Sequence, residues 1–253
     1  MTRTTISRHR KRKMLTANRL LIRWEQTVKT EVLRLLGSLA NALAEGKPEA
    51  IDDFEQRLAK LLRDRLEQVA AVFGFETLDS AKLHHAHLEE KSIFDRFRAR
   101  IKTWLSTHAT RQSKYVADAI RKRVQRALQD TLTGSEREAV KAVASQLRKG
   151  LALSIAQRIA RTETHTAANM GSQEMAEESD ADMVKEWGAT EDERTRESHA
   201  AADGQTRELD ETFQVGSANL AFPGDPDGPP EEIINCRCVA LYWPRTSSGK
   251  IVR

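Results

Sequence analysis

The sequence predicts an α+β protein, with a long N-terminal helical hairpin or bundle followed by a small C-terminal module that contains a short sheet. Apolar residues recur at helical spacing from Met14 to about residue 178, and after Ser179 the chain changes to short apolar segments separated by turn residues. The composition agrees, because 39% of the 253 residues are hydrophobic and 31% are charged. Such values favour an elongated helical part beside a small compact part.

Two amphipathic helices come first. Between residues 14 and 45 one apolar stripe repeats in steps of three and four. Its members are Trp24, Val28, Val32, Leu35, Leu39 and Ala42. Gly46-Lys47-Pro48 ends this helix, and a second stripe runs from Ile51 to Val72 until Gly74 interrupts it. We expect the two helices to fold back as a hairpin.

Three further helices are predicted before the composition changes. One runs from about residue 80 to residue 132, with a break around residues 106–113. Ser135 and Glu138 have the spacing of a capping box, so the next helix starts there. The last runs from about residue 153 to residue 178.

The C-terminal segment has the pattern of a small sheet. Residues 183–187 and 238–243 are predicted strands, residues 211–215 a weaker one, and residues 223–230 a loop rich in proline and glycine. We expect the preceding helix to pack over this sheet. The predicted division is a basic flexible arm at 1–13, an elongated helical region at 14–150, the module at 151–245 and a flexible tail at 246–253.

The net charge of +4 conceals a strong asymmetry. Residues 163–235 hold 19 acidic and four basic residues, whereas residues 1–162 carry a net charge of +15. The N-terminal arm has six cations and no acid, so we expect it to attract phosphate groups or an acidic protein surface. These cations are Arg3, Arg8, Arg10, Lys11, Arg12 and Lys13. The lack of a recognition-helix or zinc-finger pattern argues against sequence-specific DNA binding.

Several other classes of protein are disfavoured. No apolar stretch reaches the length of a membrane span, and the basic start is not followed by a signal-peptide core, so we expect the chain to stay in the cytosol where it is made and to have no membrane partner. The sequence has no phosphate loop, His-Glu-x-x-His motif or nucleophile elbow, so neither an enzyme nor a small-molecule substrate is expected. A histidine cluster is present at His84, His85 and His87, but no metal ligand of another type lies near it in the sequence. We therefore expect these side chains to be solvated.

Cys236 and Cys238 are the only cysteines, and their spacing disfavours a disulfide between them. Thiolates bind zinc well, and His199 and Asp203 are the best candidates for third and fourth ligands. In the alternative interpretation, His199 and the cysteines form a hydrogen-bonded, packed core that holds the C-terminal strand to the 192–203 segment. Both interpretations stay open, and the cofactor prediction is none or a structural zinc ion.

Charged residues near this histidine allow a second cluster. This group comprises Arg161, Glu163, Asp192, Arg194 and Arg196. Arginine pairs bidentately with carboxylate, so Arg161 or Arg194 is expected to lock the long helix against the following loop. A catalytic alternative makes Glu163 or Asp192 a general base and His199 an acid, as in a metal-assisted hydrolase or transferase of toxin-like type.

One ordered set of residues resembles a known family signature. Its members are Arg161, Glu163, Trp187, Asp192, Arg194, His199, Asp203, Gly204, Asp225, Asn235, Cys236 and Cys238. Over residues 150–243 this set resembles the C-terminal part of the phage Mu F-like head morphogenesis, or minor capsid, proteins. A related branch of that family is similar to a zinc knuckle, with Cys-x-x-Cys where this chain has Arg196-x-x-His199 and a further histidine near Ile233.

The resemblance implies a structural function in the virion. It implies attachment to the portal protein at the portal vertex of the phage head, contact with capsid or scaffold, and a contribution to head morphogenesis or DNA ejection. Non-specific contact with packaged DNA is a further expectation, based on the basic first half of the chain.

Overall fold

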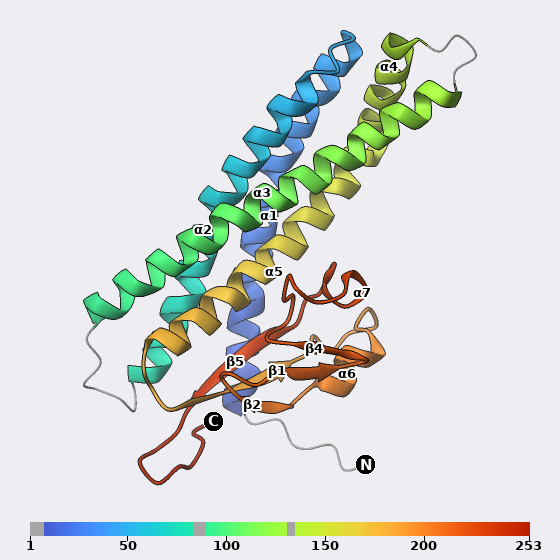
Figure 1. Cartoon of the computed structure of the whole chain (residues 1–253). Coiled ribbons are helices and arrows are strands. Elements are labelled where there is room, and N and C mark those ends of the chain that lie inside the picture. The colour runs from blue at the N-terminus through green and yellow to red at the C-terminus, as the bar shows by residue number, and fades with distance from the viewer. Residues whose placement is uncertain (1–7, 83–89, 131–134) are drawn as a thin grey trace. The chain divides into compact units, whose positions relative to one another are not determined.

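The structure, a computed structural model, describes residues 8–82, 90–130 and 135–253 (Figure 1). In these ranges it contains seven α-helices, one π-helix and five strands, which confirms the predicted α+β class. Arg3 and the cluster His84, His85 and His87 lie outside the described residues. No helix in the described ranges has both the length and the apolar character needed to cross a membrane.

The chain divides into two compact units, each built from separate stretches of sequence. The first comprises Met1–Trp24, Leu66–Ile101 and Arg161–Arg253, and the second Glu25–Arg65 and Lys102–Ala160. This division differs from the predicted one, because parts of the N-terminal helices belong to the same unit as the sheet.

The second unit consists of helices alone. It contains parts of α1 (Arg8–Ala44), α2 (Ala50–Lys82), α3 (Glu90–Asp130) and α5 (Ala152–Glu178), together with all of α4 (Glu136–Gln146) and the π-helix η1 (Leu147–Leu151). Its core is aliphatic, as the helical periodicity predicts. Fully buried members include Val28, Val32, Leu36, Leu58, Leu62, Val140 and Val143. On α1 the buried stripe includes Leu36 and Leu43, one position beyond the predicted Leu35 and Ala42.

The helix boundaries correct three expectations. Helix α1 begins at Arg8, so residues 8–13 are the first turns of a helix and not a flexible arm. Helix α2 continues through Gly74 to Lys82. The missing side chain of Gly74 leaves room for the Phe97 ring, since a Cβ atom there would lie 2.9 Å from that ring. Helix α3 runs without a break through residues 106–113.

The helix predicted after residue 135 is present as α4. Ser135 occupies its N-cap with extended backbone angles, but its side chain makes no capping hydrogen bond, so the predicted capping box is only partly formed. Gly150 in η1 has φ 117°, a conformation that glycine adopts readily, and the chain then enters α5.

The sheet of the first unit has three antiparallel strands in the order β2-β1-β5. The central strand β1 (Met183–Gly188) pairs with β2 (Thr206–Glu208) and along its whole length with β5 (Val239–Pro244). Strands β3 (Phe213–Val215) and β4 (Ala218–Leu220) form a separate hairpin. The three predicted strands are confirmed as β1, β3 and β5, whereas the sequence analysis did not predict β2 and β4.

Helix α5 packs on this sheet, as predicted. Ala176 shares a buried cluster with Ala240 and Tyr242 of β5. Lys185 of β1 is also buried, and its ammonium donates to the carbonyl oxygens of Leu209 and Ala221 at 2.8 and 2.9 Å. Because these bonds replace hydration, a cation can be accommodated inside a small core.

The C-terminal tail is ordered, which corrects the prediction of flexibility. Arg245 forms a β-bridge with Ile251, and the Thr246 N–H donates to the Lys250 carbonyl at 2.9 Å. Arg253 lies with its Nε 2.9 Å from Oε2 of Glu186, a residue of β1. Residues 245–253 therefore fold back on the sheet of the first unit.

Candidate functional site

The predicted meeting of one histidine with two thiols is present in the first unit. His199 lies on α6 (Glu197–Ala202), and Cys236 and Cys238 precede β5. The His199 Nδ1 atom is 3.3 Å from the Cys238 sulfur and 3.6 Å from the Cys236 sulfur. All three side chains are at most 2% exposed, so residues nearly 40 positions apart are joined in a closed cluster.

Glu232 fixes the orientation of the imidazole. This residue of α7 (Pro230–Ile233) has its Oε2 3.0 Å from His199 Nε2 and also accepts a hydrogen bond from the Ser198 hydroxyl at 2.9 Å. An ionised carboxylate can only accept a hydrogen bond, so the Nε2–H donates to Glu232 and Nδ1 faces the sulfurs. Carboxylates hold metal-binding histidines in the same way.

The two thiols differ in acidity. A hydrogen bond from Cys236, together with the neighbouring His199, lowers the pKa of Cys238 to about 5. The same hydrogen bond and burial raise the pKa of Cys236 well above its ordinary value. Cys238 is therefore the more acidic thiol of the pair.

These three residues fit a metal ion as well as a packed core. Their ligand atoms lie within 4.8 Å of one another, and the 3.3–3.6 Å nitrogen–sulfur separations match neighbouring ligands of a tetrahedral ion bound at about 2.0–2.3 Å. A zinc ion held by His199, Cys236 and Cys238 would supply a structural cross-link.

Asp203, the predicted fourth ligand, is engaged elsewhere. Its Oδ1 accepts hydrogen bonds from Arg10 at 2.6 Å and from the Ala189 N–H at 2.7 Å. Asp203 is the C-cap of α6, and its carboxylate binds Arg10 and the Ala189 N–H and not the cysteine cluster. Glu232, which the sequence prediction did not include, is the carboxylate beside the histidine.

Trp187 of β1 packs against this cluster. Its ring meets the His199 ring edge-on at a centroid distance of 5.5 Å and the Phe213 ring at 5.4 Å. Arg196 stands at the position where a first thiol occurs in the related branch, and its guanidinium donates to the Ile234 carbonyl at 2.6 Å. The cluster is thus bordered by the aromatic rings of Trp187 and Phe213 and by the hydrogen bond from Arg196 to the Ile234 backbone.

Asp192 pairs with Arg237, an arginine that the sequence prediction did not name. The Asp192 carboxylate accepts hydrogen bonds from both terminal nitrogens of Arg237, one of them at 2.6 Å. The Arg194 N–H donates to the Asp192 Oδ1 at 2.9 Å. The hydrogen bond from Arg237 holds the pKa of Asp192 far below its usual range. Asp192 thus ties its loop to the Cys-x-Cys segment, while Arg161 and Glu163 lie on α5, with Glu163 buried.

The other signature residues shape turns. Gly204 has φ 78° and donates its N–H to the Trp187 carbonyl at 2.8 Å. Asp225 accepts the N–H groups of Ala221 and Asp227 at 2.8 and 3.0 Å. Asn235 has φ 59°, and its N–H donates to the Thr162 hydroxyl of α5 at 3.0 Å. Each residue fixes the path of the chain around the cluster.

Two of the predicted nucleic-acid-binding cations are used inside the first unit. Arg10 is 6% exposed and bonds to Glu186 at 2.5 Å as well as to Asp203. Lys13 donates to the Tyr242 carbonyl at 2.9 Å and lies 4.3 Å from the centre of the Trp243 ring. Arg8, Lys11 and Arg12 are exposed. Because Arg10 and Lys13 are engaged in internal contacts, the six cations do not act as one free basic arm.

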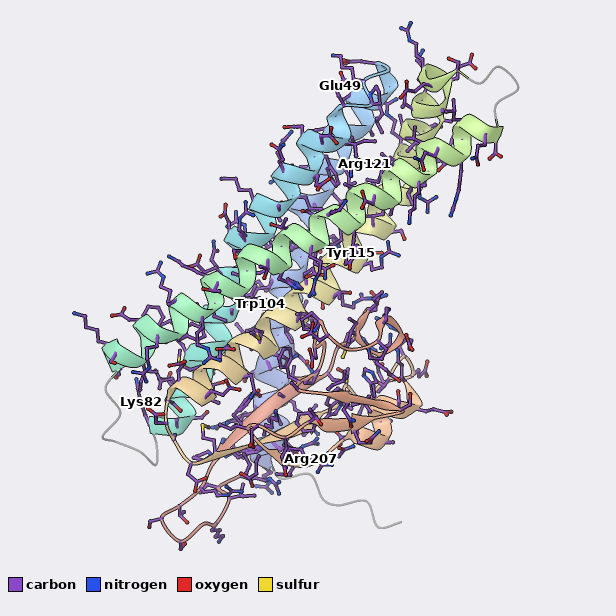
Figure 2. All side chains as sticks on the ribbon, viewed as in Figure 1. Glu49, Lys82, Trp104, Tyr115, Arg121 and Arg207 are labelled. Carbon is purple, nitrogen blue, oxygen red and sulfur yellow. The ribbon has the colours of Figure 1, made fainter. Side chains whose placement is uncertain are left out.

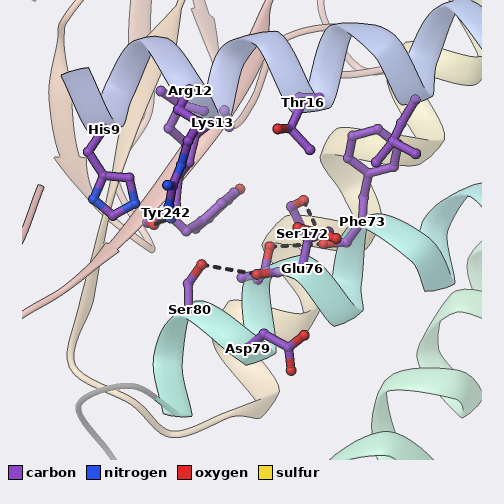
Figure 3. Close-up of a pocket in the computed structure, with 15 residues that line it drawn as sticks. His9, Arg12, Lys13, Thr16, Phe73, Glu76, Asp79, Ser80, Ser172 and Tyr242 are labelled. Atoms are coloured by element: carbon purple, nitrogen blue, oxygen red, sulfur yellow. Dashed lines mark hydrogen bonds between the residues drawn. The ribbon is translucent and has the colours of Figure 1, made fainter. Parts of the chain in front are cut away.

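A pocket of about 370 Å³ lies beside Lys13 in the first unit (Figure 3). Arg12 and Lys13 of α1 line one wall, Glu76 and Asp79 of α2 another, and Tyr242 of β5 the base. Burial lowers the pKa of Lys13 to about 8, although Glu76 acts in the opposite direction. Positive and negative groups are balanced in this pocket, so its charge selects no single class of ligand.

Asn169 is a central residue that the sequence reasoning missed. Its amide nitrogen donates to the Pro223 carbonyl at 2.8 Å, and its oxygen accepts the Ala240 N–H at 2.8 Å. The neighbouring Thr166 donates to the Gly224 carbonyl at 2.8 Å. Polar residues on the sheet-facing side of a buried helix are the signal that could have revealed this role. Helix α5 therefore holds both the proline-rich loop and β5.

A comparison with known families gives the class of protein. Residues 118–241 match the family described as "Phage Mu protein F like protein", so this part of the chain belongs to that family. The match supports a phage head morphogenesis protein and a component of the phage head.

A curated enzyme shares a shorter segment. The chain is 35% identical over 87 residues to "NAD(+)--arginine ADP-ribosyltransferase EFV" of Enterococcus faecalis (strain ATCC 700802 / V583). The match covers 33% of this chain and 18% of that protein. No solved structure matches the chain.

Proposed function

We propose that this chain is a structural minor head protein that acts in head assembly at the portal vertex of a tailed phage. The family match over residues 118–241 carries the proposal. Its proposed partners are the portal protein and the adjoining capsid or scaffold, with non-specific contact to DNA. In this function the C-terminal module is a rigid attachment unit, because its signature residues cross-link α5, β1 and β5.

The positions of the candidate catalytic residues also favour a structural function. A general acid or base must reach the proton that it transfers. The Asp192 carboxylate is bound by Arg237, and His199 is enclosed between two sulfurs and Glu232. The match to the ADP-ribosyltransferase covers a small part of that protein, and it does not favour the metal-assisted transferase alternative.

Co-expression with the portal protein of the same phage tests the proposal. We expect the chain to co-purify with assembled portal rings, and imaging of the complex to place it on the ring. As a control, the major capsid protein expressed without portal should not retain the chain. Retention by capsid shells and not by portal rings would contradict a position at the portal vertex.

Asp192→Asn separates the structural function from the enzymatic alternative. If the Asp192–Arg237 pair holds the module together, the variant loses thermal stability and portal binding in parallel. If Asp192 is a catalytic base, the variant stays as stable as the wild type and loses an NAD-consuming activity that the wild type shows. Such activity in the wild-type chain would overturn the structural proposal.

A further inference from the structure

Positive charge in the second unit is concentrated in its later helices. Residues 25–65 hold seven basic and eight acidic residues, whereas residues 102–160 hold twelve basic and four acidic ones. Within helix α3, residues 111–126 carry six cations and a single acid, Asp118. Helix α3 therefore carries a local charge that the near-neutral α1 and α2 part of the same unit does not match.

Ion pairing leaves much of this charge unbalanced. Arg121 is paired with Asp52, Glu55 and Asp118, and Lys114 also contacts Asp118. Lys122, Arg123 and Arg126 are exposed, and within the described part of the chain none of these three pairs with a carboxylate. The C-terminal half of α3 thus presents three unpaired cations to solvent.

Helical spacing gathers the charged residues on one side. Arg111, Lys122 and Arg126 follow the three-and-four residue repeat of a single helical face, and Tyr115 falls on the same face. The Tyr115 side chain is 62% exposed; Figure 2 labels it with Arg121 on α3. The 15 residue steps from Arg111 to Arg126 span about 22 Å, which equals about six to seven phosphate steps of about 3.4 Å along one DNA strand.

We propose that the exposed side of α3 binds the phosphate backbone of double-stranded DNA, with Arg111, Tyr115, Lys122 and Arg126 along its middle and Lys114 and Arg123 at its two margins. This inference rests on the proposed head function, in which the chain meets packaged DNA, and it assigns that contact to α3 and away from the N-terminal cations. Further exposed cations follow α3 in the sequence, on α4, η1 and α5. These are Lys141, Lys149 and Arg158.

The chemistry of the face favours DNA over an acidic protein. A stable protein interface needs an apolar centre and is depleted in lysine. Between residues 111 and 126 the large exposed apolar group is Tyr115 alone, and it is surrounded by cations. A phosphate backbone needs only repeated positive charge on a rigid support, which a helix provides.

Salt-dependent binding of the full chain to a fluorescent 30-base-pair duplex tests the assignment. The test variant is Lys122→Gln/Arg123→Gln/Arg126→Gln. The matched control is Lys29→Gln/Arg34→Gln/Arg63→Gln, which removes the same charge from cations of α1 and α2 that also lack a carboxylate partner in the described residues. Circular dichroism checks that both variants keep the helical content of the wild type.

We expect the test variant to reduce the slope of log affinity against log salt by about 2.7, since each lost phosphate contact removes about 0.9. The control should change this slope by less than about 0.9, which is the contribution of one phosphate contact. Equal slopes for the wild type and the test variant would overturn the assignment, and so would equal losses in both variants. Competition by polyglutamate as effective as that by DNA would instead indicate an acidic protein partner.

The portal assay separates this inference from the proposed function. If α3 binds only DNA, the test variant still co-purifies with portal rings. A variant that loses portal binding while the salt slope stays unchanged would refute the DNA assignment and leave the head function standing. A chain that binds DNA through α3 but never binds portal would overturn the head function alone.

Discussion

Arg10 donates its Nε–H to Oε1 of Glu186 at 2.5 Å, across 176 positions of sequence. Both side chains are less than 8% exposed, and Arg10 also reaches Asp203. This pair attaches the first turn of α1 to the central strand β1. The first turn of α1 is therefore part of the core of the first unit.

Removing one partner of this buried pair should destabilise the first unit strongly. Arg10→Met leaves the buried Glu186 carboxylate without its arginine partner on α1. We therefore expect the free energy of unfolding, measured in urea, to fall by about 3–5 kcal/mol. Lys11→Met, at the adjacent exposed position, should change stability by less than about 0.5 kcal/mol. A double variant, Arg10→Met/Glu186→Met, should recover much of the loss. Equal stabilities for Arg10→Met and Lys11→Met would show that the pair contributes nothing.

Gly171 of α5 predicts a second stability effect. A Cβ atom at this position would lie 2.2 Å from the Ala70 carbonyl oxygen of α2, within the first unit. Because helix backbone cannot yield like a flexible side chain, Gly171→Ala should cost about 1–3 kcal/mol. The control is Gly37→Ala on α1, where a Cβ atom meets nothing within 4 Å and better helix propensity should stabilise by up to about 1 kcal/mol. Thermal melting of both variants measures the contrast, and the same direction of change in both would contradict it.

The sequence reveals what is periodic in this fold and misses what depends on single distant contacts. Long helices and paired strands were predictable, because apolar residues repeat along many turns. The start of α1 was not, because Arg10 has an ordinary solvent-facing residue type until Glu186 and Asp203 are placed beside it. Gly74 likewise reads as a helix break until the ring of Phe97 is known to need its space.

The candidate site was predictable to a similar degree. The union of His199 with the two cysteines followed from residue types that need a partner. The fourth ligand could not be predicted in the same way. Asp203 lies four residues after His199, but it ends α6 and its carboxylate binds Arg10 and the Ala189 N–H. Glu232 lies in a proline-rich segment without regular spacing to His199, so only the folded loop brings its carboxylate to the imidazole.

The shifted pKa of Lys13 predicts a rise in stability at alkaline pH. Burial lowers the pKa in the folded chain to about 8, whereas the ordinary value is 10.5. Between these values the unfolded chain binds more protons, so the free energy of unfolding attributable to Lys13 increases with pH. Below pH 8 both states are protonated and the cost of burying the ammonium is fully present.

The measurement is the stability difference between wild type and Lys13→Met from pH 7 to pH 10.5. Subtracting the variant removes the other groups that titrate in this range, including Lys185. We expect the difference to shift in favour of the wild type as the pH rises from about 8. A flat difference across the window would mean that the Lys13 ammonium is not appreciably desolvated.

Metal titration decides between the two interpretations of the cysteine cluster. If His199, Cys236 and Cys238 hold zinc, then Co²⁺ added to the full chain should give thiolate-to-metal absorption in the near ultraviolet, and zinc should raise the melting temperature. Metal binding should also release a proton, because Cys236 keeps its proton in the metal-free cluster.

Three variants assign the roles within that site. Cys236→Ser should abolish the cobalt absorption, since it removes a thiolate ligand. Glu232→Gln should weaken zinc binding about 10- to 100-fold while the absorption at saturation remains, because the carboxylate only orients His199. Asp203→Asn should leave zinc affinity unchanged, since Asp203 is bound to Arg10 and Ala189. If the wild-type chain gives no cobalt absorption and no thermal shift with zinc, the cluster is a packed core in which His199, Cys236 and Cys238 contact one another directly.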